Sequence, residues 1–160
     1  MSEKAERMSE DHVVTKDEVS AVYPEVARAI AEALGRNADD IELESRLVGD
    51  LNAESIDFLD IVFRLERAFR IKIPRGEIVQ DARGDLPEEE FAVKGCLTEV
   101  GLARLREYLD EIPPENFRHP MRVSEVPLLF TVETFAKLVV RARRQGAAEK
   151  EGQDHGFPPR

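Results

Sequence analysis

The sequence predicts an all-α protein, because four segments have apolar side chains at the three- and four-residue intervals of an amphipathic helix. These segments are Val22–Gly35, Ser55–Phe69, Thr98–Ile112 and Thr131–Arg144. The chain has 160 residues, of which 42% are hydrophobic and 35% charged, and this is enough for one core. We therefore expect a single helical domain over residues 15–145, between disordered tails at residues 1–14 and 146–160.

The first predicted helix contains Pro24, which an α-helix accepts in its first turn, and Gly35 is suited to end it. Thr15 and Glu18 have the spacing of a capping box, which is compatible with a short extra turn before the proline. We expect Pro24 to interrupt any longer helix, since it lacks a backbone N–H.

The second predicted helix, Ser55–Phe69, is apolar over more than half of its circumference, which is more than one core face requires. The residues that fit the core side are Ile61, Val62, Leu65 and Phe69. A second apolar stripe begins beside the start of the helix and consists of Ile56, Leu59 and Phe63. We predict that this stripe contacts a partner protein. The alternative is that residues further along the chain cover it as core.

Ser55 stands where a polar turn becomes the second helix. The start of a helix exposes unpaired backbone N–H groups and the positive end of the peptide dipole, both of which favour a phosphate held there. Serine is also a preferred N-cap residue, so this position alone is compatible with a capping role.

The segment Leu51–Pro74 resembles the acyl carrier proteins, whose signature is an acidic residue, a serine, an aliphatic residue and an aspartate. Here the signature reads Glu54-Ser55-Ile56-Asp57. The resemblance implies an acyl-carrier-like helical bundle in which the Ser55 hydroxyl receives 4′-phosphopantetheine from coenzyme A. It also implies that the terminal thiol of this arm carries acyl groups as thioesters, in fatty acid or lipid biosynthesis.

The resemblance extends upstream to Val22, with Ile41, Leu43 and Leu47 placed to pack beneath the loop that joins the first two helices. Three residues depart from the family's usual choices: Glu54 replaces an aspartate, Ile56 a leucine and Asn52 a frequent glycine. These departures concern the efficiency of modification more than modification itself.

The family's partners are a phosphopantetheinyl transferase and the enzymes that synthesise and transfer acyl chains, which meet acidic groups on this helix. Arg64 and Arg67 interrupt the acidic pattern, and we hypothesise that they select specialised enzymes instead of a general synthase. The alternative is a pair of solvated arginines of little energetic consequence. The predicted partner-binding residues are Glu54, Ile56, Asp57, Leu59, Asp60, Phe63, Arg64 and Arg67.

Two alignments compete for the residues after Pro74. Segments Phe58–Phe63, Ile71–Pro74 and Glu89–Phe91 are similar to the specialised carriers that deliver very long hydroxyacyl chains to lipid A, which makes Thr98–Ile112 the fourth helix. In the other alignment Phe130–Phe135 is similar to the start of the fourth helix of ordinary carriers, and residues 78–126 form an insertion. Both alignments predict a specialised carrier with an additional helix after helix three.

A helical carrier can shelter an apolar chain between its helices, because each buried methylene contributes about 0.8 kcal/mol in the ideal case. The residues that could line such a cleft are Ile61, Val62, Leu65 and Phe69. The same four residues are equally suitable for an ordinary core, and the sequence leaves both possibilities open.

Composition and motifs argue against several other functions. The net charge of −10 disfavours nucleic acid as a partner, despite a local basic patch of Arg141, Arg143 and Arg144. No apolar run is long enough to span a membrane and the first residues are charged, so we expect a cytoplasmic, monomeric protein.

The sequence also lacks the usual signs of catalysis and of metal binding. One cysteine and three isolated histidines suggest neither a disulfide nor a metal site. No nucleotide-binding glycine motif and no GxSxG elbow occur, so we expect no catalytic residue and no enzyme. The alternative function is a helical interaction module that has the carrier fold without the arm. A serine hydrolase is a more remote third possibility, for want of a histidine base.

Overall fold

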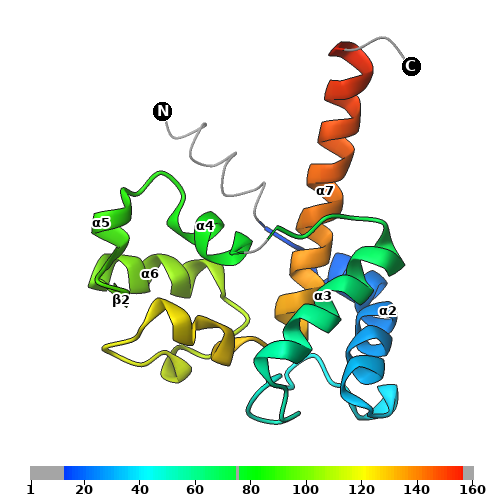
Figure 1. Ribbon diagram of the computed structural model, residues 1–160, viewed down its shortest axis with the longest axis horizontal. Coiled ribbons are helices and arrows are strands. Elements are labelled where there is room, and N and C mark those ends of the chain that lie inside the picture. Colours follow the sequence, from blue (N-terminus) through cyan, green and yellow to red (C-terminus); the bar gives the residue numbers. More distant parts are fainter. Residues whose placement is uncertain (1–12, 75, 157–160) are drawn as a thin grey trace.

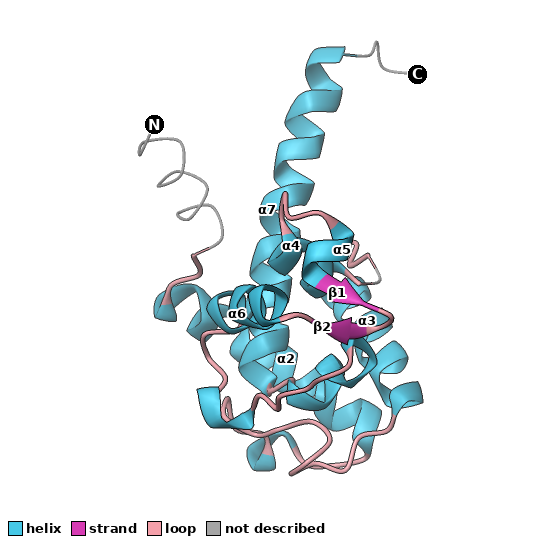
Figure 2. Cartoon of the chain, turned by 90° about the vertical axis from the view of Figure 1, so that its left-hand side faces the viewer, coloured by secondary structure: helices cyan, strands magenta, loops and turns pink. Residues whose placement is uncertain are grey.

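A computed structural model of the chain describes residues 13–74 and 76–156. Its helices are α2 (Lys16–Leu34), α3 (Ser55–Phe69), α4 (Glu77–Arg83), α5 (Glu88–Phe91), α6 (Glu99–Tyr108) and α7 (Val132–Gly156). Short 3-10 helices are η1 (Ala38–Asp40), η2 (Pro114–Asn116) and η3 (Val123–Leu129). Strands β1 (Ala92–Val93) and β2 (Cys96–Leu97) pair antiparallel (Figure 2). The predicted all-α fold is confirmed, with this small hairpin as an addition.

The helices fall into two groups (Figure 1). Helix α2 packs against both α3 and α7, and these three helices form a bundle. Helices α4 and α5 pack against α6, and β1 joins α5 to form the second group. The fully buried side chains Ile30 of α2, Ile61 of α3 and Val139 of α7 belong to one continuous hydrophobic core. The predicted helix Ser55–Phe69 is therefore confirmed, and it lies against α2 as a bundle helix.

The loop between α2 and α3 is paired with the start of α7 by three backbone hydrogen bonds. The Leu47 N–H donates to the Phe130 carbonyl at 3.0 Å, and the Val132 N–H donates to the Ser45 carbonyl at 3.0 Å. The Glu133 N–H donates to the Leu43 carbonyl, also at 3.0 Å. Because these bonds join distant segments, they set the position of the loop that leads into α3.

The expectation that Pro24 begins or interrupts the first helix is wrong. Helix α2 runs unbroken through Pro24, and its N-cap is Thr15, which forms a reciprocal capping box with Glu18. The carboxylate of Glu18 also accepts two hydrogen bonds from Arg144 of α7, both at 2.7 Å. Two buried residues before the proline, Val19 and Val22, add core packing. The cap and this packing offset the hydrogen bond that the proline cannot make.

Helix α7 lies beside α2, whereas α6 packs against α4, α5 and β2. This arrangement favours the alignment in which the segment starting at Phe130 is the fourth bundle helix. Helix α6 also ends at Tyr108 instead of the expected Ile112. The following residues Leu109 and Ile112 are nevertheless buried, because the chain turns there toward α7.

The predicted end of the last helix near Arg144 is also wrong, because α7 continues to Gly156 where we expected a disordered tail from Gly146. Its C-terminal part projects beyond the rest of the chain (Figure 1, Figure 2). Alanine, glutamate, lysine and glutamine in this segment are strong helix formers, and each glycine inside a helix costs only about 1 kcal/mol. In the expected N-terminal tail, the Val13 carbonyl accepts a hydrogen bond from Arg144 of α7, so this residue is held against the helix. Residues 1–12 and 157–160 of the predicted tails lie outside the described residues.

Lys137 of α7 connects the chain after α6 to the bundle through ion pairs, in which Lys137 and Glu111 are buried and Asp110 is exposed. Its Nζ lies 2.7 Å from Asp110 Oδ1, 3.1 Å from Glu111 Oε1 and 3.7 Å from Glu133 Oε2. Burial alone would lower the pKa of Lys137, but the hydrogen bond to Asp110 and the charge of Glu111 outweigh it and raise this pKa. Burial raises the pKa of Glu133. The cluster thus holds the chain after α6 against the bundle.

Within the described residues, no helix is both long and apolar enough to cross a membrane.

We predict that Gly101→Ala destabilises the α5–α6 group. An added Cβ would lie 2.0 Å from the Phe91 carbonyl oxygen, which belongs to the backbone and cannot rotate away. Overpacking of this kind costs about 3 kcal/mol or more, and the melting temperature should fall by about 6–12 °C. Gly146→Ala is the matched control, because nothing lies near its Cβ position in α7. Circular dichroism measures the melting temperature. If Gly101→Ala melts at the same temperature as wild type, the close packing of Gly101 on the Phe91 backbone is contradicted.

We predict that Lys137→Met lowers the free energy of unfolding by about 3–5 kcal/mol, since it leaves the buried Glu111 carboxylate without its charge partner. The exposed Lys72→Met should change it by no more than about 0.5 kcal/mol. A raised lysine pKa stabilises the fold below the ordinary value of 10.5, and this contribution disappears as pH rises through the folded pKa. Urea unfolding from pH 7 to 11 should therefore show an alkaline loss of stability that Lys137→Met lacks. A parallel pH profile for the two proteins would contradict the assignment.

Candidate functional site

The turn that leads into α3 is closed by backbone and carboxylate hydrogen bonds. The Ala53 N–H donates to the Leu47 carbonyl at 2.8 Å, and Asp50 Oδ2 accepts the Arg46 N–H at 2.9 Å. That bond, with the Arg46 guanidinium nearby, lowers the pKa of Asp50 despite its partial desolvation. Asn52 has a φ of +58°, in the left-handed region that asparagine and glycine adopt most readily. Asn52 therefore adopts a left-handed conformation that glycine, a frequent residue at this position, also adopts readily.

Ser55 is the first residue of α3, and its side chain is exposed. Among the described residues, its hydroxyl has no hydrogen-bond partner. The N-cap position belongs to Glu54, whose backbone N–H donates to Asp57 Oδ2 at 2.8 Å. The capping role considered for Ser55 is thus taken by its neighbours, and the hydroxyl is available for chemistry at the positive end of the helix dipole.

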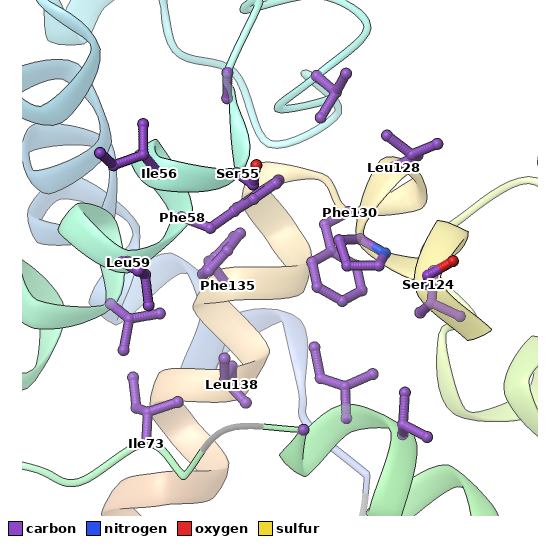
Figure 3. A pocket seen from close by; sticks show the side chains of 18 of the residues that line it. Ser55, Ile56, Phe58, Leu59, Ile73, Ser124, Leu128, Phe130, Phe135 and Leu138 are labelled. Atoms are coloured by element: carbon purple, nitrogen blue, oxygen red, sulfur yellow. The ribbon is translucent and has the colours of Figure 1, made fainter. Parts of the chain in front are cut away.

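An apolar pocket of about 980 Å³ begins at Ser55 and extends between α3, α4, η3 and α7 (Figure 3). Aliphatic and aromatic side chains make up most of its lining. Those from α3 are Ile56, Phe58, Leu59, Val62 and Phe63, and those from other elements include Val48, Ile73, Ile78, Val79, Val123, Val126, Leu128, Phe130, Phe135 and Leu138. Polar lining comes from Glu54, Ser55, Glu66 and Ser124. The pocket is therefore suited to an apolar ligand with a polar end near Ser55.

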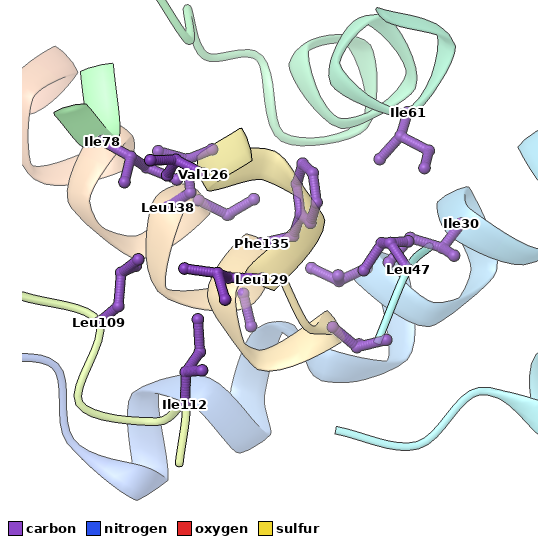
Figure 4. Close-up of a cluster of buried hydrophobic side chains, with 14 of the residues drawn as sticks. Ile30, Leu47, Ile61, Ile78, Leu109, Ile112, Val126, Leu129, Phe135 and Leu138 are labelled. Carbon is purple, nitrogen blue, oxygen red and sulfur yellow. The ribbon is translucent and has the colours of Figure 1, made fainter. Parts of the chain in front are cut away.

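Three aromatic rings pack together inside this pocket, close to Ser55 (Figure 3). Phe58 stacks on Phe135 with ring centroids 6.1 Å apart, and Phe130 meets each of them edge to face at 6.3 and 6.0 Å. The side of the pocket away from Ser55 contains Ile73 and Leu138 (Figure 3). There Leu138 adjoins the buried residues Ile78 and Val126 (Figure 4).

The second apolar stripe of α3 is exposed. Ile56, Leu59 and Phe63 have exposed fractions of 69%, 40% and 58%. The alternative that later residues cover this stripe as core is therefore wrong. The three residues form one side of the pocket mouth, where Leu128 of η3 lies on the other side of Ser55 (Figure 3).

Some of the charged residues of α3 form ion pairs or hydrogen bonds within the protein. Arg64 Nε lies 2.9 Å from Asp60 Oδ1, and its Nη1 lies 3.1 Å from Glu32 Oε2 of α2. The carboxylate of Glu66 accepts the Ile73 N–H at 2.8 Å. Arg67 is exposed, and no described residue pairs with it. The helix thus presents a mixed surface on which Arg64 offsets the charge of Asp60.

Of the four residues considered for an acyl cleft, only Val62 lines the pocket. Ile61 and Leu65 are fully buried in the bundle core, and Phe69 lies under the guanidinium of Arg143. The pocket uses residues that sequence reasoning did not assign to it, such as Phe130, Phe135 and Val123. The helical spacing of Phe135 indicated burial but not its neighbours, and Phe130 and Val123 lie outside the helices that the sequence predicted.

The part of the chain that the structure describes contains no group of three or more metal-ligating side chains. His119 is exposed, and Cys96 is a half-buried free thiol in β2. Within these residues, no histidine lines the pocket near Ser55 to act as a base.

Comparisons with known proteins agree with this site. A family model described as "Phosphopantetheine attachment site" matches residues 24–83, which contain Ser55 and its turn. The acyl carrier protein AcpXL of Brucella melitensis is 42% identical over 76 residues, covering 47% of this chain and 82% of that protein. AcpXL of Rhizobium meliloti is 40% identical over 76 residues, covering 47% and 80%. The acyl carrier protein of Borrelia garinii is 41% identical over 56 residues, covering 35% and 70%.

No solved structure matches the chain. The sequence relatives are nevertheless covered over most of their length, and those named AcpXL are of the specialised carrier type. The prosthetic group of the matched family is phosphopantetheine. Carriers of this family are not catalysts. The chain belongs to the acyl carrier protein family.

Proposed function

We propose that Ser55 is the residue to which 4′-phosphopantetheine is attached, and that the chain carries acyl groups in specialised fatty acid or lipid biosynthesis. The observation that supports this proposal best is the exposed, unpartnered Ser55 hydroxyl at the mouth of an apolar pocket. When attached, the arm supplies a terminal thiol for the acyl group.

The residues around Ser55 fit a phosphodiester in three ways. The first N–H groups of α3 have no partner within the helix and point toward an anion at its start. The Asp57 carboxylate is held by the Glu54 N–H, so that the first turn of the helix is closed without using the serine. Asn52 turns the chain immediately before the helix and leaves the hydroxyl accessible.

The pocket lining fits an apolar acyl chain. Phe58, Phe130 and Phe135 lie close to Ser55, and aliphatic side chains continue beyond them. On the side away from Ser55, the charged side chain of Glu66 also lines the pocket, and its carboxylate accepts the Ile73 N–H. Burial of each methylene there would contribute up to about 0.8 kcal/mol, and the same burial would exclude water from the chain.

The exposed stripe of Ile56, Leu59 and Phe63 is our candidate surface for the transferase and for the acyl-processing enzymes. Exposed apolar side chains rimmed by charges are typical of protein contact sites. The flanking residues Glu54, Asp57, Asp60, Arg64 and Arg67 complete this proposed surface. The Arg64–Asp60 pair makes it less acidic than an uninterrupted row of carboxylates, which supports a specialised set of enzymes.

We further propose that residues 15–145 form one domain with residues 78–126 as an insertion, in accord with the packing of α7 on α2. We also propose action in the cytoplasm and, because very long chains are carried by similar specialised carriers, a role in lipid assembly. The second candidate function is an interaction module without the arm, which the exposed stripe alone would also suit.

We predict that a phosphopantetheinyl transferase with coenzyme A adds one arm to the wild-type chain and none to Ser55→Ala. Ser124→Ala is the matched control, because Ser124 is the other serine of the same pocket and is also exposed. Intact-mass spectrometry should show the added arm on Ser124→Ala as on wild type. An unmodified wild-type chain with several transferases would favour the interaction module, and a modified Ser55→Ala would disprove the attachment residue.

We predict that Ile56→Ser and Phe63→Ser each lower the kcat/KM of the transferase for the unmodified chain by about tenfold. A central apolar contact contributes more than about 1 kcal/mol to an interface, and 1.4 kcal/mol corresponds to a factor of ten. Val100→Ser is the control, since Val100 is similarly exposed but lies on α6. The rate of mass increase measures the effect. Equal rates for all four proteins would show that the stripe does not contact the transferase.

A further inference from the structure

Helix η3 lines a large part of the pocket although it lies outside residues 24–83 that the family model matches. Its lining residues are Val123, Ser124, Val126, Pro127 and Leu128. It faces α3 across the pocket, so it forms a wall that the matched part of the chain does not supply (Figure 3).

Both ends of η3 are fixed by backbone hydrogen bonds. Before it, the Leu97 N–H donates to the Met121 carbonyl at 2.8 Å, and at its start the Val123 N–H donates to the Gly95 carbonyl at 2.9 Å. After it, the Phe130 carbonyl accepts the Leu47 N–H at 3.0 Å. The wall is thus attached to the β hairpin at one end and to the loop before Ser55 at the other. Such an element has a defined position relative to the attachment serine.

The side chains of η3 divide between the inside and the rim of the pocket. Val126 is fully buried beside Ile78 and Leu138, on the side away from Ser55 (Figure 4). Leu128 is 51% exposed at the mouth, close to Ser55 (Figure 3). An apolar chain that enters beside Ser55 would meet Leu128 first and Val126 later.

We propose that η3 is the length-selecting wall of the pocket: its side chains inside the pocket, with Val123 and Val126 foremost, determine how long an acyl chain on Ser55 can be buried. This inference rests on the attachment at Ser55 proposed above. The pocket volume of about 980 Å³ lies at the upper end of the range of about 300–1,000 Å³ for ligand sites, which favours a long chain over a short one. The occupant is a saturated acyl chain tethered to Ser55.

The test loads a series of saturated acyl groups, from four to eighteen carbons, onto the full chain. A promiscuous phosphopantetheinyl transferase moves each acyl-phosphopantetheine from its coenzyme A ester to the Ser55 oxygen. The new serine–phosphate bond replaces the pyrophosphate bond, and adenosine 3′,5′-bisphosphate leaves with the proton released by the hydroxyl. Intact mass confirms each loading before the melting temperature and amide hydrogen exchange are measured.

For the wild-type chain, the melting temperature should rise with acyl length until the pocket is filled, by up to about 3–6 °C for each two methylenes. Hydrogen exchange at Val126, Leu128 and Leu129 should slow over the same range. Val123→Trp places a larger side chain in the pocket lining. The rise of its melting temperature with acyl length should therefore stop at a shorter chain. Val100→Trp makes the same change on the exposed face of α6 and should behave as wild type.

Leu128→Ser provides a second variant that does not disturb the core, because the side chain is half exposed. Because every chain that enters beside Ser55 passes Leu128, it should reduce the gain for short and long chains alike and leave the limiting length unchanged. The proposal would be overturned if loaded wild-type protein showed no dependence on acyl length, or if both η3 variants reached the same limiting length and gain as wild type. Failure of the loading itself, seen as an unchanged mass, would instead overturn the attachment at Ser55 and this inference with it.

Discussion

The backbone pairing between the α2–α3 loop and the start of α7 is the constraint on which the site depends. Hydrogen bonds from Leu47, Val132 and Glu133 join these two segments, which are far apart in the sequence. One segment continues into Ser55 and the other follows η3. The same few bonds therefore set the distance between Ser55 and the opposite wall of the pocket.

The first turn of α3 combines rigidity with accessibility. Glu54 and Asp57 close the turn, and Asn52 adopts the left-handed conformation that brings the chain into the helix. A serine that capped its own helix would have its hydroxyl engaged by a backbone N–H. Because neighbouring residues perform this task, the Ser55 hydroxyl remains exposed while its backbone is fixed.

The residues between α3 and α7 form a second group of helices beside the bundle. Helices α4 and α5 pack on α6, and Lys137 with Asp110 and Glu111 attaches the chain after α6 to α7. Removal of one partner from the buried Lys137–Glu111 pair is costly, whereas an exposed pair such as Arg28–Glu25 contributes little. The added segment is thus held at a defined place beside the pocket.

The sequence by itself determined the helices with a clear apolar period, the limits of α3 and the family to which the chain belongs, because these depend on local spacing and on the residues around Ser55. It also indicated the second stripe of α3, but exposure of Phe63 depends on what packs nearby. Local signals misled at Pro24, where a cap and core packing outweigh one missing hydrogen bond. Only the tertiary structure decided between core and pocket: Ile61 belongs to the core, whereas Phe130, Phe135 and η3 line the pocket. These contacts join residues that are distant in sequence, and no local periodicity encodes such pairing.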